Sequence, residues 1–221
     1  MIMNFYSRLQ QATVRERTEL HAAPIIADVL AGSASRQDYL SFLQRAFHHV
    51  RHTVSLFAAC ADRLPKSNVA FQQAIAHYIA EEQGHEKWIL DDIAAAGGDA
   101  WSVAASHPDR DTELMVAYAY DTVTRGNPLG LFGMVYVLEG TSVGLAKTIA
   151  GQLRETLQLP ANALTYLTSH GDLDISHIAH FERLMNHLEN TEDQHCVIHC
   201  ARTFFHLYGN VLRNISPSRS V

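Results

Sequence analysis

The sequence predicts an all-α protein that folds as one helical bundle. Apolar residues recur at helical spacing along most of the chain, and no segment shows the sustained alternation that is typical of a strand. Short breaks rich in Gly, Pro, Ser and Asn separate the helical segments. With 221 residues and 47% hydrophobic content, residues 1–221 can bury a sizeable core, and this length suits a single domain.

The first two helices are expected in residues 4–64. The first covers residues 4–30 and kinks near Pro24, because proline removes a backbone donor. An Ala-Gly-Ser-Ala-Ser stretch then interrupts the pattern. Ser35, with Asp38 three residues later, resembles a capping box and predicts the start of a second helix. That helix ends near residue 64, before a proline.

The next segment predicts a long third helix, a loop and a shorter fourth helix. Ser67 or Asn68 caps the third helix, and a glycine pair that begins at Gly97 ends it. Residues 99–110 are expected to form a loop. The fourth helix spans residues 112–124, and a Gly-Asn-Pro sequence breaks it.

The last third of the chain predicts three further helices, which brings the expected total to about seven. Proline fits the first turn of a helix, so the fifth helix is expected over residues 128–157. The sixth covers residues 162–188 and the seventh residues 190–215. Residues 216–221 are polar and are expected to form a frayed tail.

Composition and charge exclude several classes of function. The formal net charge is −6 with only 18% charged residues and no Lys/Arg-rich run, which argues against nucleic-acid binding. We find no uninterrupted apolar stretch of roughly 18 residues, so no membrane span is expected. Residues 1–9 lack the apolar run of a signal peptide, and we therefore expect a cytoplasmic protein.

Histidine is unusually frequent, while cysteine is sparse. The chain has 14 histidines, and imidazole is the commonest nitrogen ligand for metals in proteins. Cys60, Cys196 and Cys200 form neither a disulfide framework nor a CxxC pair. Cys196 and Cys200 are one helical turn apart, a spacing that favours helix packing over metal binding.

The first candidate for metal-binding residues is an ExxH sequence in the third helix. Glu82 and His85 are three residues apart, and Glu81 and His85 are four apart, so either pair shares one helical face. A carboxylate and an imidazole at this spacing are typical of carboxylate-bridged diiron sites in helical bundles. A solvated acidic patch beside a histidine would give the same pattern, so this motif alone does not distinguish a metal site from a solvated surface.

A single acidic residue, Glu139, interrupts the apolar fifth helix. A buried, unpaired carboxylate costs several kcal/mol, so Glu139 requires a cation, a proton or a hydrogen-bonding network of hydroxyl groups. Four glycines of this helix would allow close approach of another backbone or of a flat ligand. They are Gly130, Gly133, Gly140 and Gly144.

The strongest single motif is HxxxDxxH in the sixth helix. His170, Asp174 and His177 occupy positions i, i+4 and i+7 and therefore lie on one stripe of the helix. A mixed set of imidazole and carboxylate suits Fe(II) or Mn(II) better than a metal that prefers thiolate. With the other two motifs, the expected ligand set has three carboxylates and three imidazoles, enough for two irons. It consists of Glu82, His85, Glu139, His170, Asp174 and His177, with Glu81 as an alternative to Glu82.

These segments together resemble the haem-oxygenase-like diiron oxidases and oxygenases, a superfamily that also includes TenA-like thiaminases and pyrroloquinoline-quinone synthases. The resemblance covers nearly the whole chain through helix order and the EExGH, YVLEG and HxxxDxxH segments. It implies a haem-oxygenase-like bundle and the same six metal ligands. It also implies two Fe(II)/Fe(III) ions and O2 as co-substrate. The expected substrate is a small organic molecule, such as an amino acid or fatty acid derivative, and an external electron donor would serve the reaction.

The sequence departs from this family at the second helix. Some relatives place an additional glutamate ligand there, whereas this chain has His48, His49 and His52. His48 or His49 could replace that ligand. Alternatively, two of the three histidines are exposed and one packs against the core.

Two other classes of function stay open at this level. A haem-binding protein would use His21, whose Thr-Glu-Leu-His setting resembles the proximal region of haem oxygenases. A TenA-like hydrolase would need a cysteine near the fifth helix, and residues 135–140 contain none. A metal-free binding protein is the remaining option. A homodimer could form through Phe204, Phe205 and Tyr208, but these residues would equally complete the protomer core.

Overall fold

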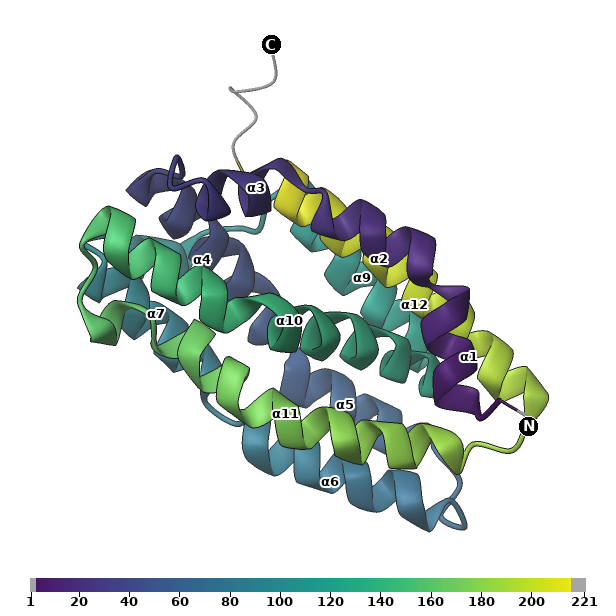
Figure 1. The fold of residues 1–221 in the computed structure, drawn as a ribbon. Helices are drawn as coiled ribbons and strands as arrows, with labels where there is room; N and C mark the ends of the chain where they lie inside the picture. The colour runs from purple at the N-terminus through teal and green to yellow at the C-terminus, as the bar shows by residue number, and fades with distance from the viewer. Residues whose placement is uncertain (1–2, 216–221) are drawn as a thin grey trace.

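The computed structural model describes residues 3–215, except for the side chains of residues 170–176. All regular structure in this range is helical and no strand occurs in it, so the all-α prediction is confirmed (Figure 1). The frayed tail predicted for residues 216–221 lies outside the described range. The α-helices and the two short 3-10 turns (η1 and η2) follow in this order: α1 (Phe5–Ala12), α2 (Val14–His21), α3 (Pro24–Leu30), α4 (Arg36–Val50), α5 (Thr53–Arg63), α6 (Val69–Glu82), α7 (His85–Ala95), α8 (Ala100–Ala105), α9 (Arg110–Thr124), η1 (Pro128–Gly130), α10 (Leu131–Leu157), η2 (Ala161–Ala163), α11 (Thr165–Asn186) and α12 (Thr191–Arg213).

The expected total of seven helices was too low, because each of the first three predicted helices is interrupted. The first becomes α1, α2 and α3, the second becomes α4 and α5, and the third becomes α6 and α7. The break between α6 and α7 is at Gly84, whose φ of 93° is in the left-handed region that glycine adopts without strain. This break changes the direction of the chain inside the ExxH motif.

Capping residues in the sequence predicted where helices start more accurately than the sequence predicted helix lengths. Ser35 and Asp38 form the capping box predicted for the start of α4, each side chain accepting from the other residue's backbone N–H. The loop predicted for residues 99–110 is only partly a loop. Asp99 accepts a hydrogen bond from the backbone N–H of Ser102 and thereby starts the short helix α8.

Helix α10 runs through the middle of the bundle (Figure 1). It packs mainly against α11 and α12, and it also contacts α3, α5 and α9. The stretch Pro128–Leu157 has an 18-residue window of mean hydropathy 1.5, so its length and composition would allow a membrane span. This corrects the expectation that no stretch is apolar enough. Because 61% of that window is buried within the bundle, its apolar character is that of a core helix.

The last helix contributes to the protomer core. Phe204 and Phe205 are 1% and 3% exposed, which confirms the core interpretation of these aromatic residues over the interface interpretation. Tyr208, one turn later, is half-buried and lines an internal cavity. These residues therefore offer no exposed apolar surface for a dimer.

Candidate metal centre

The ExxH motif spans the break between two helices. Glu82 is the last residue of α6 and His85 is the first of α7, so they do not share one continuous helical face as predicted. The turn at Gly84 nevertheless leaves the Glu82 carboxylate Oε2 only 3.2 Å from His85 Nδ1. Both side chains are largely buried, with 12% and 3% exposure. His85 also stacks on Trp88, with 4.1 Å between ring centroids. The pair is thus brought together by a bend, which the spacing rule does not anticipate.

His177 on α11 connects carboxylates from two other helices. Its Nε2 lies 3.0 Å from Glu81 Oε2 on α6, and its Nδ1 lies 3.7 Å from Glu139 Oε1 on α10. The His177 and Glu139 side chains are 6% and 12% exposed. The structure therefore brings together three ligand-type side chains from three helices. Glu81, rather than Glu82, is the carboxylate of this helix that reaches His177.

Two of the predicted ligands, His170 and Asp174, have side chains outside the described residues. Their backbone belongs to α11, so the helical spacing that they share with His177 holds. Their roles as ligands stay a prediction.

Two histidines that the sequence reasoning missed lie beside this cluster. His77 Nε2 is 3.1 Å from Glu81 Oε2, so Glu81 lies between His77 and His177. The His180 ring is 5.9 Å from that of His77, and burial lowers the pKa of His180, assisted by the nearby charge of Arg183. Both residues were detectable from sequence, because His77 precedes Glu81 by four residues and His180 follows His177 by three.

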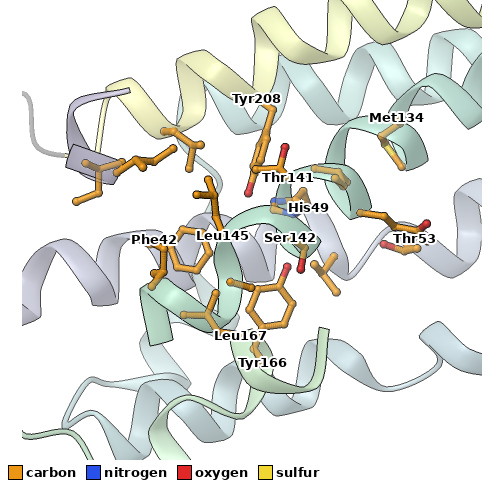
Figure 2. Close-up of a pocket in the computed structure, with 18 of the residues that line it drawn as sticks. Phe42, His49, Thr53, Met134, Thr141, Ser142, Leu145, Tyr166, Leu167 and Tyr208 are labelled. Atoms are coloured by element: carbon orange, nitrogen blue, oxygen red, sulfur yellow. The ribbon is translucent and has the colours of Figure 1, made fainter. Parts of the chain in front are cut away.

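Glu82 and Glu139 are among the residues that line an apolar cavity of about 160 Å³. Figure 2 shows other residues of its wall, such as Phe42 and Leu145. Its wall is formed by side chains from α3, α4, α5, α6, α10, α11 and α12, including Phe42, Leu145 and Leu167. Such a cavity is close in size to the roughly 150 Å³ apolar cavity that holds one benzene molecule. It therefore has room for a small apolar group next to the two carboxylates.

The electrostatics of this cavity suit a cation. Asp38, Glu82 and Glu139 line it, and among its described lining residues there is no lysine or arginine. Asp38 is already engaged with Ser35, whereas Glu82 and Glu139 face imidazoles. A metal ion bound between such imidazoles and partly buried carboxylates would stabilise them. Among the described residues, no group of three His, Cys, Asp or Glu side chains already surrounds a common metal position. The donor types fit iron, and His170 and Asp174 would complete the set.

The four glycines predicted to allow close approach, in η1 and α10, differ in their surroundings. A Cβ atom at Gly130 would lie 2.6 Å from Cys200 Sγ, and one at Gly133 would lie 2.6 Å from the Ala201 backbone nitrogen. Gly133 therefore permits the close approach of the α12 backbone, as predicted, whereas Gly130 makes room for side chains of α9 and α12. Cβ atoms at Gly140 and Gly144 would meet nothing within 4 Å. Neither position shows the close backbone approach that was considered for all four.

The residues required by the alternative functions lie away from this cavity. His21 is exposed and does not line it. No cysteine is among the described lining residues. Cys196 and Cys200 pack beside η1 with their Sγ atoms 4.0 Å apart, and Cys60 donates to the Pro128 carbonyl there. This arrangement confirms that the cysteine pair serves helix packing.

The comparisons with known proteins agree with this fold. Residues 40–209 match the family model described as an iron-containing redox enzyme. A protein domain of unknown function with a haem-oxygenase-like fold from Shewanella denitrificans superimposes with a TM-score of 0.85 at 24% identity. That match covers 97% of this chain and 93% of the other. No curated protein is a significant match to the sequence.

More distant structures share the fold alone. A TenA homologue from Pseudomonas syringae has a TM-score of 0.81 at 10% identity, covering 96% of this chain and 92% of its own. The haem complex of haem oxygenase-1 from Synechocystis has a TM-score of 0.78 at 12% identity, with the same coverage. The bundle is therefore haem-oxygenase-like. Since the family model spans most of the sequence, the chain belongs to the family of iron-containing redox enzymes.

Proposed function

We propose that this protein is an O2-dependent non-haem iron oxidase or oxygenase, with two irons held between α6, α7, α10 and α11. The observation that carries the proposal is the convergence at His177, where carboxylates from α6 and α10 meet an imidazole from α11 beside an apolar cavity. Carboxylates and imidazoles projecting inward from separate helices are the donor arrangement of diiron proteins.

The side chains have distinct roles in this proposal. Glu82 and His85 at the bend would hold iron from one side, and Glu139 and His177 from the other. His170 and Asp174 would add the remaining donors from α11. Bound Fe(II) would supply the reducing equivalents that activate O2, with an external donor restoring them. The buried aliphatic wall excludes water and so protects the reacting substrate from side reactions.

The cavity favours a substrate with an apolar portion. Its aliphatic and aromatic wall can hold an acyl chain or an apolar amino-acid side chain, and its described lining offers no cationic group to bind a free carboxylate. The acidic or polar end of such a substrate would therefore face the iron. A fatty acid or an amino acid derivative satisfies both conditions.

Iron binding tests this proposal directly. We expect anaerobic Fe(II) titration of the metal-free protein to give about two ions per chain. Glu139→Ala and His177→Ala should each reduce iron affinity at least tenfold, because each removes a donor atom. Matched controls are Glu155→Ala on α10 and His187→Ala on α11, since both residues are exposed and neither lines the cavity. Both controls should bind iron like the wild type.

Mixing the iron-loaded protein with O2 then tests the redox part. We expect a change in visible absorption in the wild type that Glu139→Ala lacks. An iron affinity that is the same in Glu139→Ala, His177→Ala and the wild type would contradict the proposal. Tight haem binding with a Soret band, in place of Fe(II) binding, would favour the haem alternative.

A cavity-filling variant tests the site of substrate binding. Ala146 is 4% exposed and lines the cavity, so Ala146→Phe should fill part of it. We expect a medium-chain fatty acid to bind about tenfold more weakly, equivalent to the loss of about two buried methylene groups. Thr148→Phe, on the exposed face of the same helix, is the control. Calorimetry measures both, and equal affinities for the two variants would place the substrate elsewhere.

A further inference from the structure

We infer that the Tyr208 hydroxyl determines substrate specificity by donating a hydrogen bond to a neutral oxygen acceptor, such as a carbonyl, on the part of the substrate that enters the apolar cavity. This inference rests on the proposed function and narrows its substrate class. Tyr208 belongs to α12 and lines the cavity together with Glu82 and Glu139. Figure 2 shows its side chain reaching from α12 into the cavity.

The Tyr208 hydroxyl is positioned to donate to a bound molecule. It makes no hydrogen bond with the part of the chain that the structure describes. The loss of hydration on burial raises the pKa of Tyr208 to about 12, although the side chain is only half-buried by its accessible surface. The surface that it exposes therefore faces the cavity rather than bulk water. At neutral pH the phenol keeps its proton and offers one O–H donor.

A second hydroxyl of the cavity wall also lacks an acceptor. Ser142 Oγ is buried and has no hydrogen-bond partner among the described residues. Its neighbour Thr141 differs, because its hydroxyl donates to the Val137 carbonyl at 2.6 Å. A buried hydroxyl without a partner costs free energy, which a ligand with an acceptor atom restores. Ser142 reaches such a ligand by rotation about its Cα–Cβ bond between staggered positions.

The charges of the wall favour a neutral acceptor over a carboxylate. Asp38, Glu82 and Glu139 line the cavity, and its described lining includes no lysine or arginine. A ligand carboxylate in this space would be repelled by these acidic groups and would be buried without a cation. A carbonyl oxygen accepts from Tyr208 without burying a charge. The charged end of the substrate is therefore expected at the iron, and a neutral carbonyl in the cavity.

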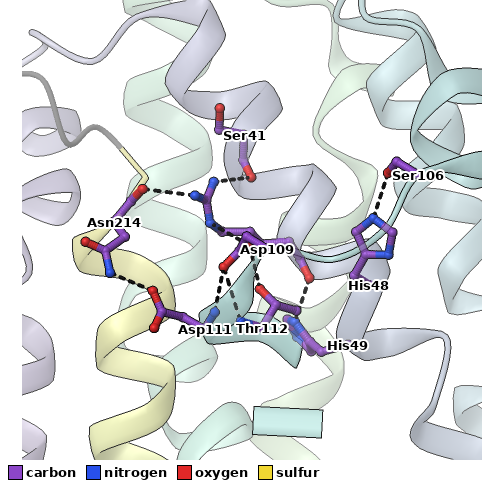
Figure 3. A network of polar contacts seen from close by, with 9 residues as sticks. Ser41, His48, His49, Ser106, Asp109, Asp111, Thr112 and Asn214 are labelled. Carbon is purple, nitrogen blue, oxygen red and sulfur yellow. Dashed lines mark hydrogen bonds and ion pairs between the residues drawn. The ribbon is translucent and has the colours of Figure 1, made fainter. Parts of the chain in front are cut away.

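The Tyr208 ring is held by contacts with α4. It meets the His49 ring edge to face, with 6.0 Å between centroids. His49 Nδ1 lies 3.0 Å from the Arg45 carbonyl oxygen. Arg45 Nε is in turn 3.1 Å from Asp109 Oδ2, and its Nη2 donates to the Asn214 carbonyl at 2.9 Å, as Figure 3 shows around Asp109 and Asn214. A ring that is fixed before binding loses little conformational entropy when a ligand arrives.

The three histidines at the end of α4 and the start of α5 have different environments. His49 lines the cavity, whereas His48 does not, and His48 Nε2 is 2.9 Å from Ser106 Oγ. His52 Nδ1 is 3.1 Å from the Tyr120 hydroxyl. The expectation of two exposed histidines was wrong, because His48 and His49 are both buried and His52 is half-buried. A role of His48 or His49 as an iron ligand stays a prediction.

Binding of two probes of similar shape to the metal-free protein tests the role of Tyr208. Cyclohexanone and methylenecyclohexane differ in that a C=O group replaces a C=CH2 group, so only the ketone accepts a strong hydrogen bond. We expect Tyr208→Phe to bind cyclohexanone about tenfold more weakly than the wild type, and methylenecyclohexane within about twofold of it. Calorimetry measures both affinities. Infrared spectroscopy should show a lower C=O stretching frequency for cyclohexanone bound to the wild type than for cyclohexanone bound to Tyr208→Phe.

Tyr39→Phe is the matched control. Tyr39 also lines the cavity, but its hydroxyl donates to the Ala163 carbonyl at 2.7 Å. Its loss should leave the affinity for cyclohexanone within about twofold of that of the wild type, because this hydroxyl is already engaged. The C=O stretching frequency of the bound ketone should also stay as in the wild type. Circular dichroism checks that both variants are folded.

Three results would overturn the inference. They are an unchanged affinity of Tyr208→Phe for cyclohexanone, an equal weakening of both probes, which would mean that the hydroxyl only shapes the cavity, and no binding of cyclohexanone by the wild type. Because the protein is metal-free in these measurements, none of them depends on iron. The Fe(II) titration tests the proposed function separately. A wild type that binds cyclohexanone through Tyr208 but binds no iron would refute the iron function alone.

Discussion

Replacing Gly133 with alanine is expected to destabilise the protein by about 2–3 kcal/mol, because the added methyl group overpacks a helix contact. A Cβ atom at this position would lie 2.6 Å from the Ala201 nitrogen and 2.9 Å from the Val197 oxygen. Both are backbone atoms of α12, which cannot rotate away as a side chain can. The two central helices would have to separate, and the buried contacts between them would loosen.

Gly151→Ala provides a matched control in the same helix. A Cβ atom at Gly151 meets nothing within 4 Å, so only helix propensity changes and the variant should be up to about 1 kcal/mol more stable. Urea unfolding followed by circular dichroism measures both effects. Equal unfolding midpoints for the two variants would show that α10 and α12 do not approach as closely as described.

Replacing Asp92 with alanine is expected to cost about 2–4 kcal/mol, since it removes two hydrogen bonds to a buried charged acceptor. Asp92 on α7 is fully buried, and its carboxylate accepts from the backbone nitrogens of Thr165 and Tyr166 at 3.0 and 2.8 Å. It therefore caps the first turn of α11 from a different helix. Because α11 carries His177, we also expect weaker iron binding in this variant.

The pH dependence of the free energy of unfolding gives a second measure of how Asp92 contributes to stability. Burial raises its pKa above the ordinary value of 3.8, although its backbone hydrogen bonds act in the opposite direction. The folded state then binds more protons than the unfolded state between these two pKa values. The contribution of Asp92 to the free energy of unfolding therefore falls as pH rises through that window and is constant above it.

Denaturant titrations of the wild type and Asp92→Ala at several pH values test this sign. The stability advantage of the wild type should shrink as pH rises from 3.8 through the raised pKa. Asp92→Asn keeps one acceptor oxygen and should lose about half of the stability that alanine loses. An advantage that grows with pH would mean that the backbone hydrogen bonds outweigh burial.

Motifs with short sequence spacing were the most predictable part of the site. His177 and Glu139 were identified from a histidine-carboxylate stripe and from an isolated charge in an apolar helix, and they lie 3.7 Å apart. His77 and His180 could have been found by the same spacing rule. The bend between Glu82 and His85 could not, because glycine adopts left-handed and right-handed conformations about equally well, so the sequence does not show which one Gly84 takes.

By itself the sequence determined the helical class, the capping of helices such as α4, and the residue types available to bind iron. These properties depend on backbone hydrogen bonding and side-chain periodicity within a few residues. Only the tertiary structure decided which of Glu81 and Glu82 reaches His177, and which of His48 and His49 faces the cavity. Adjacent residues have almost identical local signals. Their environments differ because packing between distant helices selects which face of each helix points inward.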